Sequence, residues 1–468
     1  MARVARPTPT RFTGMSHRRE GPAPDPASDV PVGDDGDGPD PEPGGAAATR
    51  RLRPLLGDRT WPIIVSVVFI LVAWAYFLLW GPVVRHERLW QIPGDIWGTY
   101  RAAHYVGWGD IADTFNPVTG MVAPPAIAVL LAPVAMLTGA LNLPESVYPY
   151  FLAKPSSWIF LGSAVLLLGT TTIFAVNRLA VTLMVASRRR LVLCLLVTAP
   201  IWLVAVMWGH PEDCVALTLA IYALVRGFRE QWRISGWLWG AAIAFQPFVL
   251  LMFPMALSVV PAGQRVKTIV RGALPALALL IIPLTTNWPL TSLALFKQPN
   301  YPTLDYPTPW MAVAPRLSAL TVGSGPGRLI AVLVAVGLGI AAYRWHPTWD
   351  ALIWGCAVAL SARCVFESVI VPFYLGPPVI LCLVAAATRP RRWRLAVTFA
   401  AGLAVLIASY DRTGEWPYWL VMTALLTVAL AAAWPGRDRI VQRIDPSEVV
   451  DVERPGLDDI EVVGPRPA

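Results

Sequence analysis

Between residues 61 and 434 the chain is mostly a succession of long apolar stretches separated by short polar loops. An α-helix needs roughly 20 apolar residues to cross a bilayer, and most of these stretches approach that length. In lipid, only helices and closed barrels satisfy every backbone hydrogen bond, and these stretches are too long and too uniformly apolar for barrel strands. The sequence therefore predicts an all-α fold, a polytopic transmembrane helical bundle.

The composition agrees with this fold class, because charged residues make up only 15% of the chain against roughly 25% in a soluble domain. We expect about eleven or twelve apolar segments. They cover residues 61–80, 124–141, 156–177, 191–208, 212–226, 236–260, 269–287, 327–343, 349–363, 368–388, 395–409 and 416–434.

The chain divides into a membrane domain and polar tails. Residues 1–55 are rich in Pro, Gly, Asp and Arg and predict a disordered tail, and residues 436–468 predict a second one. Residues 56–435 then form the transmembrane domain. Arginines at positions 50, 51 and 53 precede the first span, which favours a cytoplasmic N-terminus. We expect a multi-pass protein of the plasma membrane with both tails in the cytoplasm.

The net charge of +8 comes almost entirely from arginine. These arginines flank apolar spans, so they predict topology signals and contacts with anionic lipid rather than nucleic-acid binding. The five cysteines lie in or beside apolar segments without the spacing of metal ligands. We interpret them as small buried apolar residues, and no residue pattern requires a metal or another cofactor.

Arginine-rich loops predict which segments face the cytoplasm: residues 188–190, 226–233, 263–267 and 389–394. The outer face then carries two long loops rich in Trp, Tyr and Pro, residues 81–123 and 288–326. It also carries residues 209–213, 363–368 and 409–416.

Two stretches do not alternate with this pattern. Segments 124–141 and 156–177 must together make one net crossing, and segment 236–260, broken by Pro247 and Pro254, must return to its starting side. Re-entrant or half-length helices would resolve both stretches. The alternative is that the charge rule fails here.

Asp95 is the first candidate for chemistry. It lies in the outer loop after the first span, where a carboxylate is able to act as a general base. Tyr100, Arg101 and His104 follow at spacings that share a helical face, and we treat them as candidate substrate-binding residues. The alternative is structural, because Asp is a preferred N-cap and a plausible amphipathic helix begins directly after it.

A second candidate cluster is His210, Glu212 and Asp213, between two apolar segments. Such side chains are able to bind a metal or sugar hydroxyls. A loop with Pro and acidic residues is equally typical of an ordinary helix start.

Arg363 and Glu367 are four residues apart at a predicted membrane boundary, so they are able to pair on one helical face. Arg363 is a candidate ligand of a lipid phosphate, because its planar fork matches phosphate oxygens. A simple intrahelical ion pair is the alternative. Lys297 in the second outer loop is a further phosphate candidate, and Lys154 is a weaker one because its side of the membrane is unsettled.

Motifs of soluble nucleotide chemistry are missing from the sequence. It contains no Walker loop, GxSxG elbow, HExxH pair or dinucleotide fingerprint, and no stretch suited to a soluble α/β domain. Any activated sugar donor should therefore be carried by a lipid.

A pattern of weak motifs extends through the membrane region. It consists of Asp95, Tyr100, Ala102, Ala103, Gly109, Phe115-Asn116-Pro117, Pro124-Pro125, Pro133, Gly209-His210, Gln246-Pro247, Arg363, Phe366, Glu367 and Pro372-Phe373-Tyr374. This pattern resembles glycosyltransferase family 87, a group of C-type (GT-C) membrane glycosyltransferases that includes actinobacterial mannosyltransferases dependent on polyprenyl-phosphate mannose.

The resemblance implies an enzyme that moves a sugar, most often mannose, from a polyprenyl-phosphate donor to a glycolipid or glycan of the cell envelope. Transfer would invert the anomeric centre on the extracytoplasmic face, with Asp95 as the base. Members of the family commonly have Lys-Pro at the position where this chain has Gln246-Pro247, so this chain lacks the cation of that lysine. It departs again at His210, where Gln is common.

Other functions remain open at this stage. An arabinose-type transferase of the same fold is one alternative. A transporter or flippase for a lipid or solute is another, since broken helices suit transporters, although no internal repeat is visible and acidic residues are scarce in the apolar segments. An inactive scaffold of an envelope-synthesis complex, with its tails as docking arms, is a third.

Overall fold

The computed structural model describes residues 44–79, 90–91, 93, 95–116, 121, 123–143, 147–148, 152–153, 155–302, 306–410 and 414–436, with the side chains at 44–59, 90–91, 147–148, 152–153 and 155–156 excepted. Within these residues the chain is mainly helical with a few two-residue strands, which confirms the predicted all-α polytopic class. Helix α1 (Gly44–Leu79) begins inside the stretch expected to be a tail. The reason is local composition, since Ala, Arg and Leu after Gly44 are strong helix formers. The rest of both predicted tails, residues 1–43 and 437–468, lies outside the described residues.

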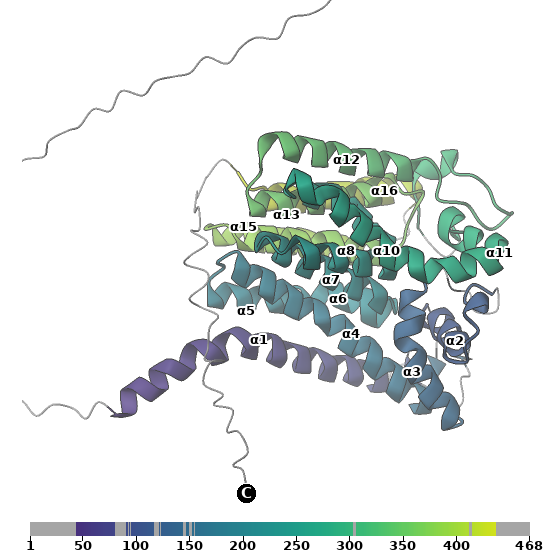
Figure 1. The fold of residues 1–468 in the computed structure, drawn as a ribbon, viewed down its shortest axis with the longest axis horizontal. Helices are drawn as coiled ribbons and strands as arrows, with labels where there is room; N and C mark the ends of the chain where they lie inside the picture. Colours follow the sequence, from purple (N-terminus) through teal and green to yellow (C-terminus); the bar gives the residue numbers. More distant parts are fainter. Residues whose placement is uncertain are drawn as a thin grey trace, which may run out of the picture. The chain divides into compact units, whose positions relative to one another are not determined.

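Residues from Arg53 onward form one compact unit of packed helices (Figure 1). In the described part of the chain, seven helical segments are long and apolar enough to cross a membrane. They are Thr60–Leu79, Ser157–Thr182, Ser187–Met207, Ala262–Thr286, Gly327–Trp345, Trp349–Phe366 and Glu415–Ala433. The protein is therefore a multi-pass membrane protein, as its composition predicted.

Six of these spans lie in single long helices. The long helices are α1, α4 (Pro155–Thr182), α7 (Pro211–Phe228), α10 (Ala262–Thr286), α12 (Gly327–Trp345), α13 (Trp349–Phe366), α15 (Arg392–Ala408) and α16 (Glu415–Ala433). The span at Ser187–Met207 combines α5 (Ser187–Leu196), α6 (Thr198–Ile201) and the π-helical η3 (Trp202–Met207).

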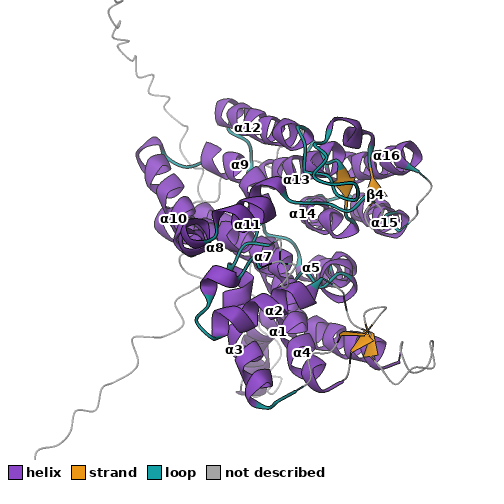
Figure 2. Cartoon of the chain, turned by 90° about the vertical axis from the view of Figure 1, so that its right-hand side faces the viewer, coloured by secondary structure: helices purple, strands orange, loops and turns teal. Residues whose placement is uncertain are grey.

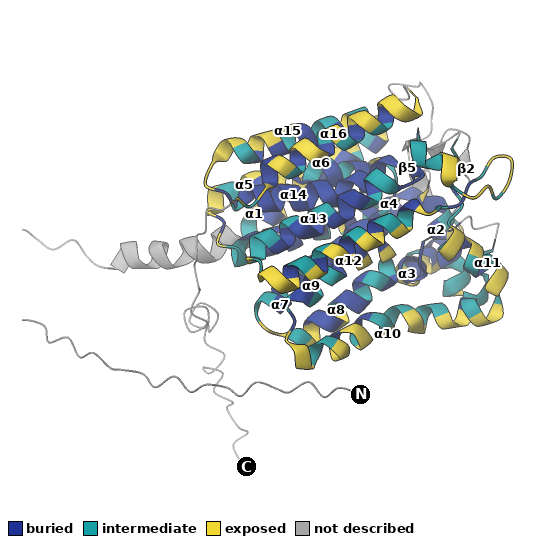
Figure 3. Ribbon diagram, turned by 90° about the horizontal axis from the view of Figure 1, so that it is seen from above, coloured by how far each residue is buried: buried dark blue, intermediate teal, exposed yellow. Residues whose placement is uncertain are grey.

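Burial separates interior helices from lipid-facing ones. Every residue of α14 (Gly376–Ala387) is buried, and this helix packs against α13 and α15 in the centre of the bundle (Figure 3). Helix α10 is the opposite case, because its exposed side carries Ile269, Leu277 and Ile281. Apolar side chains without a protein partner are what contact with lipid tails requires.

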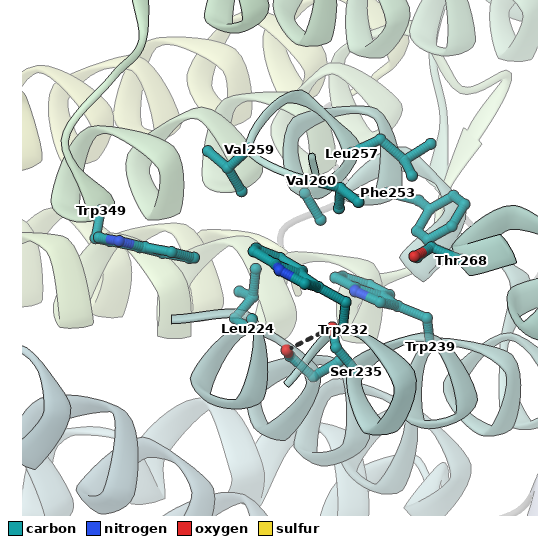
Figure 4. Close-up of a pocket in the computed structure, with 13 residues that line it drawn as sticks. Leu224, Trp232, Ser235, Trp239, Phe253, Leu257, Val259, Val260, Thr268 and Trp349 are labelled. Carbon is teal, nitrogen blue, oxygen red and sulfur yellow. Dashed lines mark hydrogen bonds between the residues drawn. The ribbon is translucent and has the colours of Figure 1, made fainter. Parts of the chain in front are cut away.

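The segment at 236–260 folds as a pair of half-length helices. Helix α8 (Trp232–Phe245) ends at Gln246, whose extended backbone leads into η4 (Pro247–Leu251) and α9 (Phe253–Ser258). The start of α8 and the end of α9 line one small cavity, with Trp232 and Val260 on its walls (Figure 4). The chain therefore returns to its starting side, as predicted.

The other irregular stretch also makes one crossing. Helix α3 (Ala126–Ala140) is too short to count among the spans and packs against α2 (Ile96–Gly107), whereas α4 is long enough to span. Tyr100 of α2 hydrogen bonds to Thr138 of α3, which joins the pair. In Figure 1 both lie at the same end of the bundle as α11 (Trp288–Ser292).

The predicted cytoplasmic loops meet at the opposite end. Arg189 donates to the backbone oxygens of Arg389 and Pro390, and Arg389 pairs with Asp350. Arg265 lies over the ring of Tyr343 with its guanidinium carbon 4.4 Å from the centroid. The structure thus separates the arginine-rich loops from the predicted outer loops, and the assignment of either end to the cytoplasm stays a prediction.

Short strands tie the outer loops together. Strand β4 (Tyr306–Pro307) pairs antiparallel with β5 (Val369–Ile370), which joins the 288–326 loop to the segment after α13 (Figure 2). Strands β1 (Trp90–Gln91), β3 (Leu152–Ala153) and β2 (Val147–Tyr148) form an antiparallel sheet in that order. Short helical turns fill the remaining loops: η2 (Ile111–Asp113), η5 (Leu293–Lys297), η6 (Pro309–Val313) and η7 (Pro372–Leu375).

Candidate functional site

Asp95 stands directly before α2, but its side chain does not cap that helix. The backbone at this position is helical, and no hydrogen bond from the helix amides reaches the carboxylate. Its Oδ2 atom instead lies 3.0 Å from Nε2 of His210. The side chain is 49% exposed, so the carboxylate is partly open to its surroundings. The structural alternative, a conventional N-cap, is therefore wrong for this side chain.

His210 is held between two carboxylates. Its Nδ1 atom lies 2.6 Å from Oε1 of Glu212, on the side of the ring away from Asp95. Phe373 of η7 stacks on the imidazole with ring centroids 3.7 Å apart and an interplanar angle of 24°. These contacts fix the ring orientation and aim Nε2 at Asp95.

Gly209 makes this meeting of loops possible. Its backbone φ of +75° lies in the left-handed region that favours glycine. A Cβ atom here would lie 2.8 Å from Cβ of Pro93 and 3.0 Å from Cβ of Ile96. The chain before α7 therefore approaches the start of α2 closely, which brings His210 next to Asp95.

The surroundings of His210 favour its charged form. Burial lowers the pKa of the imidazole, but the negative charges of Glu212 and Asp95 and their hydrogen bonds raise it more, leaving it well above its ordinary value. When protonated, the ring donates a hydrogen bond from each nitrogen, one to each carboxylate. The result is a cation between two anions, with Glu212 buried and Asp95 at the surface.

A second charged cluster lies at the end of α13. The Nε atom of Arg328 is 3.1 Å from Oε2 of the buried Glu367, and Nε of Arg363 is 3.7 Å from the same oxygen. The predicted pairing of Arg363 with Glu367 is therefore present, although Glu367 follows the last residue of α13 and has an extended backbone. Among the described residues, Nη2 of Arg328 has no hydrogen-bond partner.

Aromatic rings connect the two clusters. Phe373 contacts Tyr374 with ring centroids 4.7 Å apart, and the guanidinium carbon of Arg363 lies 3.9 Å from the centroid of Tyr374. Asp213, Arg363 and Tyr374 also line one small cavity. Gln246, at the break after α8, interacts with Asp213. The broken segment thus contributes a polar side chain to the site.

The structure does not bring the remaining α2 candidates to this cluster. Tyr100 is buried against α3, and the ring of His104 packs on it with centroids 4.8 Å apart. Arg101 is exposed and donates from Nε to the backbone oxygen of Trp97 at 3.5 Å. Tyr100 and His104 therefore share the face that packs against α3, whereas Arg101 does not take part in this packing.

The lysine candidates have different outcomes. Lys297 is exposed at the end of η5, and the next residue, Gln298, donates to the hydroxyl of Tyr374 at 3.3 Å. Lys297 is therefore next in sequence to a residue that contacts Tyr374 of the site. It makes no ion pair with the described residues. Lys154 lies outside the described residues.

Sequence reasoning did not single out Arg328. A signal was present, because this arginine stands at the predicted outer end of a span, where the charge rule disfavours it. Among the described residues, no group of His, Cys, Asp and Glu side chains has an arrangement able to hold a metal ion.

No family model matches the sequence, and no curated protein matches it either.

Proposed function

We propose that the protein is a membrane glycosyltransferase that takes a sugar, with mannose as the first candidate, from a polyprenyl-phosphate donor. The acceptor is a glycolipid or glycan of the cell envelope. The observation that carries this proposal is the carboxylate of Asp95, which leaves its helix uncapped and stands half exposed, 3.0 Å from His210. A surface carboxylate with a fixed partner is suited to take a proton from a hydroxyl.

The reaction follows from the roles of these groups. The acceptor hydroxyl gives its proton to the Asp95 carboxylate while its oxygen forms a bond to the anomeric carbon of the donor sugar. The bond from that carbon to the phosphate oxygen breaks, and the lipid phosphate leaves with the electron pair. Attack opposite the leaving group inverts the anomeric centre. No cofactor takes part in this scheme.

The leaving phosphate needs positive charge, which the second cluster supplies. Arg363 and Arg328 share the carboxylate of Glu367, Arg363 also interacts with Asp213, and Nη2 of Arg328 has no hydrogen-bond partner among the described residues. Arginine binds phosphate through paired N–H groups, and stabilising a leaving phosphate is a common role of such side chains. Lys297, exposed nearby in the chain, is a further candidate for this role.

A lipid-borne donor fits the position of the site at one end of the helices. The polyprenyl chain would stay in the bilayer beside the exposed apolar faces, while its phosphate and sugar reach the polar cluster. We expect this end to face outward from the plasma membrane, because the arginine-rich loops gather at the other end and such loops favour the cytoplasm.

A transporter or flippase is the second candidate function. The paired half-helices α8 and α9 support it, because helices broken near a polar site are typical of transporters. Gln246 at the break contacts Asp213, which would be a suitable arrangement for a transported polar group.

Reconstitution into liposomes separates these functions. Purified protein would receive labelled polyprenyl-phosphate mannose together with an extract of envelope glycolipids as acceptors. We expect label to move into a glycolipid without any nucleotide sugar. Label that crosses the bilayer while staying on polyprenyl phosphate would contradict the transferase and favour the flippase.

A further inference from the structure

His210, the residue directly before α7, has charged neighbours on both sides of its ring. Carboxylates face both ring nitrogens, at 3.0 Å for Asp95 and 2.6 Å for Glu212. Phe373 covers one face of the ring, so the imidazole is only 12% exposed. A neutral imidazole has one N–H and is able to donate to only one of these carboxylates.

Glu212 requires a cationic partner at this position. Its side chain is 1% exposed, and burying an ionised carboxylate without a paired charge is costly. His210 is its ion-pair partner in the described part of the chain, and its second oxygen, Oε2, has no hydrogen-bond partner there. The buried carboxylate therefore favours a proton on His210.

The charges around His210 come from several elements. Asp95 faces it from the start of α2, and Glu212 and Asp213 face it from the first turn of α7. The neighbouring η7 contributes the uncharged ring of Phe373. Arg363 of α13 interacts with Asp213 rather than with the imidazole. The balance near the ring is thus negative.

We propose that His210 is a positioning residue of the transfer reaction, an imidazolium that stays protonated and holds Oδ2 of Asp95. This inference rests on the proposed glycosyl transfer. With Oδ2 engaged by the ring, Oδ1 is the oxygen that takes the proton from the acceptor hydroxyl. His210 keeps both ring protons during the reaction, because its ion pair with the buried Glu212 stabilises the charged ring.

The proposal predicts an alkaline limit to activity. Loss of the ring proton would release the Asp95 carboxylate and leave Glu212 buried beside a neutral ring, so transfer should fall with the loss of one proton. A substitution that donates a hydrogen bond without titrating should remove this limit. Glutamine meets this condition, because its amide N–H₂ donates at every pH.

The first experiment compares pH profiles of sugar transfer from labelled polyprenyl-phosphate mannose. Full-length wild type and the variants His210→Gln, Glu212→Gln and His346→Gln would be reconstituted into liposomes. His346 is an exposed histidine after α12, at the arginine-rich end, and serves as the matched control. We expect His210→Gln to lose part of the wild-type rate, because Glu212 loses its cationic partner, but to show no alkaline fall. Glu212→Gln should move the fall to lower pH by about one unit or more, and the control should keep the wild-type profile.

A second measurement reads the charge of His210 without activity. The chain has five histidines, so nuclear magnetic resonance of protein labelled at histidine resolves individual rings, and the signal missing from His210→Gln identifies this one. We expect its titration midpoint to fall in Glu212→Gln and in Asp95→Asn. Thermal unfolding of each variant shows that it is folded.

The outcomes separate the two proposals. An alkaline fall that persists in His210→Gln, or a His210 midpoint that does not respond to Glu212→Gln, overturns the positioning role. A protein that transfers no sugar at any pH overturns the proposed function, while the titration still decides whether both carboxylates hold the proton on His210.

Discussion

At the scale of single residues, Gly209 controls whether the two halves of the site meet. We predict that Gly209→Ala destabilises the protein by about 1–3 kcal/mol, because the left-handed backbone disfavours a side chain. The new Cβ would also collide with Pro93 at 2.8 Å. Thermal unfolding in detergent, together with sugar transfer, measures both effects.

Gly109 provides the control for this prediction. Its φ is +87°, but a Cβ added there would meet nothing within 4 Å. Gly109→Ala should therefore lower the thermal midpoint through backbone strain while sugar transfer is preserved. If Gly109→Ala and Gly209→Ala lose transfer equally, close packing against Pro93 is not what matters.

The charge of His210 should also appear in the pH dependence of stability. The pKa of this ring is raised in the folded protein, mainly by Glu212 and Asp95 against the opposing effect of burial. A raised pKa contributes stability that is complete below the ordinary value of about 6.5 and is lost as pH rises through the folded value.

We therefore predict that wild-type stability falls as pH rises above about 6.5, by up to about 1.4 kcal/mol per unit from this group. His210→Gln should lack this part of the slope. Thermal midpoints measured across the pH range in one detergent give the comparison, and equal slopes in both proteins would contradict it.

Residue types and spacing predicted only part of this cluster. Asp95, His210 and Arg363 were singled out because ionisable residues at span boundaries are unusual, and the structure joins them through Phe373 and Tyr374. Their roles toward a substrate stay predictions. Helical spacing also grouped His104 with Tyr100, but spacing does not reveal which face packs against a neighbour.

At the scale of elements, small residues decide how closely helices approach. A Cβ at Gly240 of α8 would overlap the backbone oxygen of Arg271 in α10. Backbone is unable to move aside as a flexible side chain does, so Gly240→Ala should separate α8 from α10 and lower stability by about 1–3 kcal/mol.

Gly337 of α12 is the matched control for Gly240. It also lies inside a helix, and a Cβ there would meet nothing within 4 Å. Gly337→Ala should be neutral or stabilising by up to about 1 kcal/mol, because Ala favours helix more than Gly. A comparison of thermal midpoints checks both variants, and equal losses would contradict the close approach.

The return of segment 236–260 was predictable from the arginines on either side of it. Loops at 226–233 and 263–267 both read as cytoplasmic, so the chain between them had to come back. The contact of Gln246 with Asp213 was not predictable, because it depends on how deep the break lies relative to α7.

At the scale of the whole molecule, topology predicts which end of the helices is accessible from outside. All five native cysteines are buried, so a maleimide should label an introduced surface cysteine with little background labelling of the native ones. Ser318 is exposed in the 288–326 loop, at the end of the bundle that carries the candidate site. Ser187 is exposed at the arginine-rich end, directly before Arg188. We predict that Ser318→Cys is labelled by an impermeant maleimide in intact cells, and Ser187→Cys only after permeabilisation.

The opposite labelling pattern would place the site in the cytoplasm. Such a result would contradict the extracytoplasmic reaction while leaving the helical fold intact. Labelling of both cysteines in denatured samples confirms that each is present and reactive.

The general architecture follows from composition because the bilayer allows few solutions, and that is why the helical class was predictable. The site was harder to predict, since Arg328 becomes meaningful only when α12 lies beside the end of α13. Contacts between distant segments depend on packing that one sequence does not display.

The most direct test of the central claim is the rate of sugar transfer by Asp95→Asn. Asp110→Asn is its control, because Asp110 is an exposed aspartate of the same loop whose side chain also leaves its helical turn uncapped. We predict that Asp95→Asn lowers transfer from labelled polyprenyl-phosphate mannose by about 100-fold or more, as loss of a general base does, while Asp110→Asn keeps the wild-type rate. Transfer by Asp95→Asn at the wild-type rate would contradict the account.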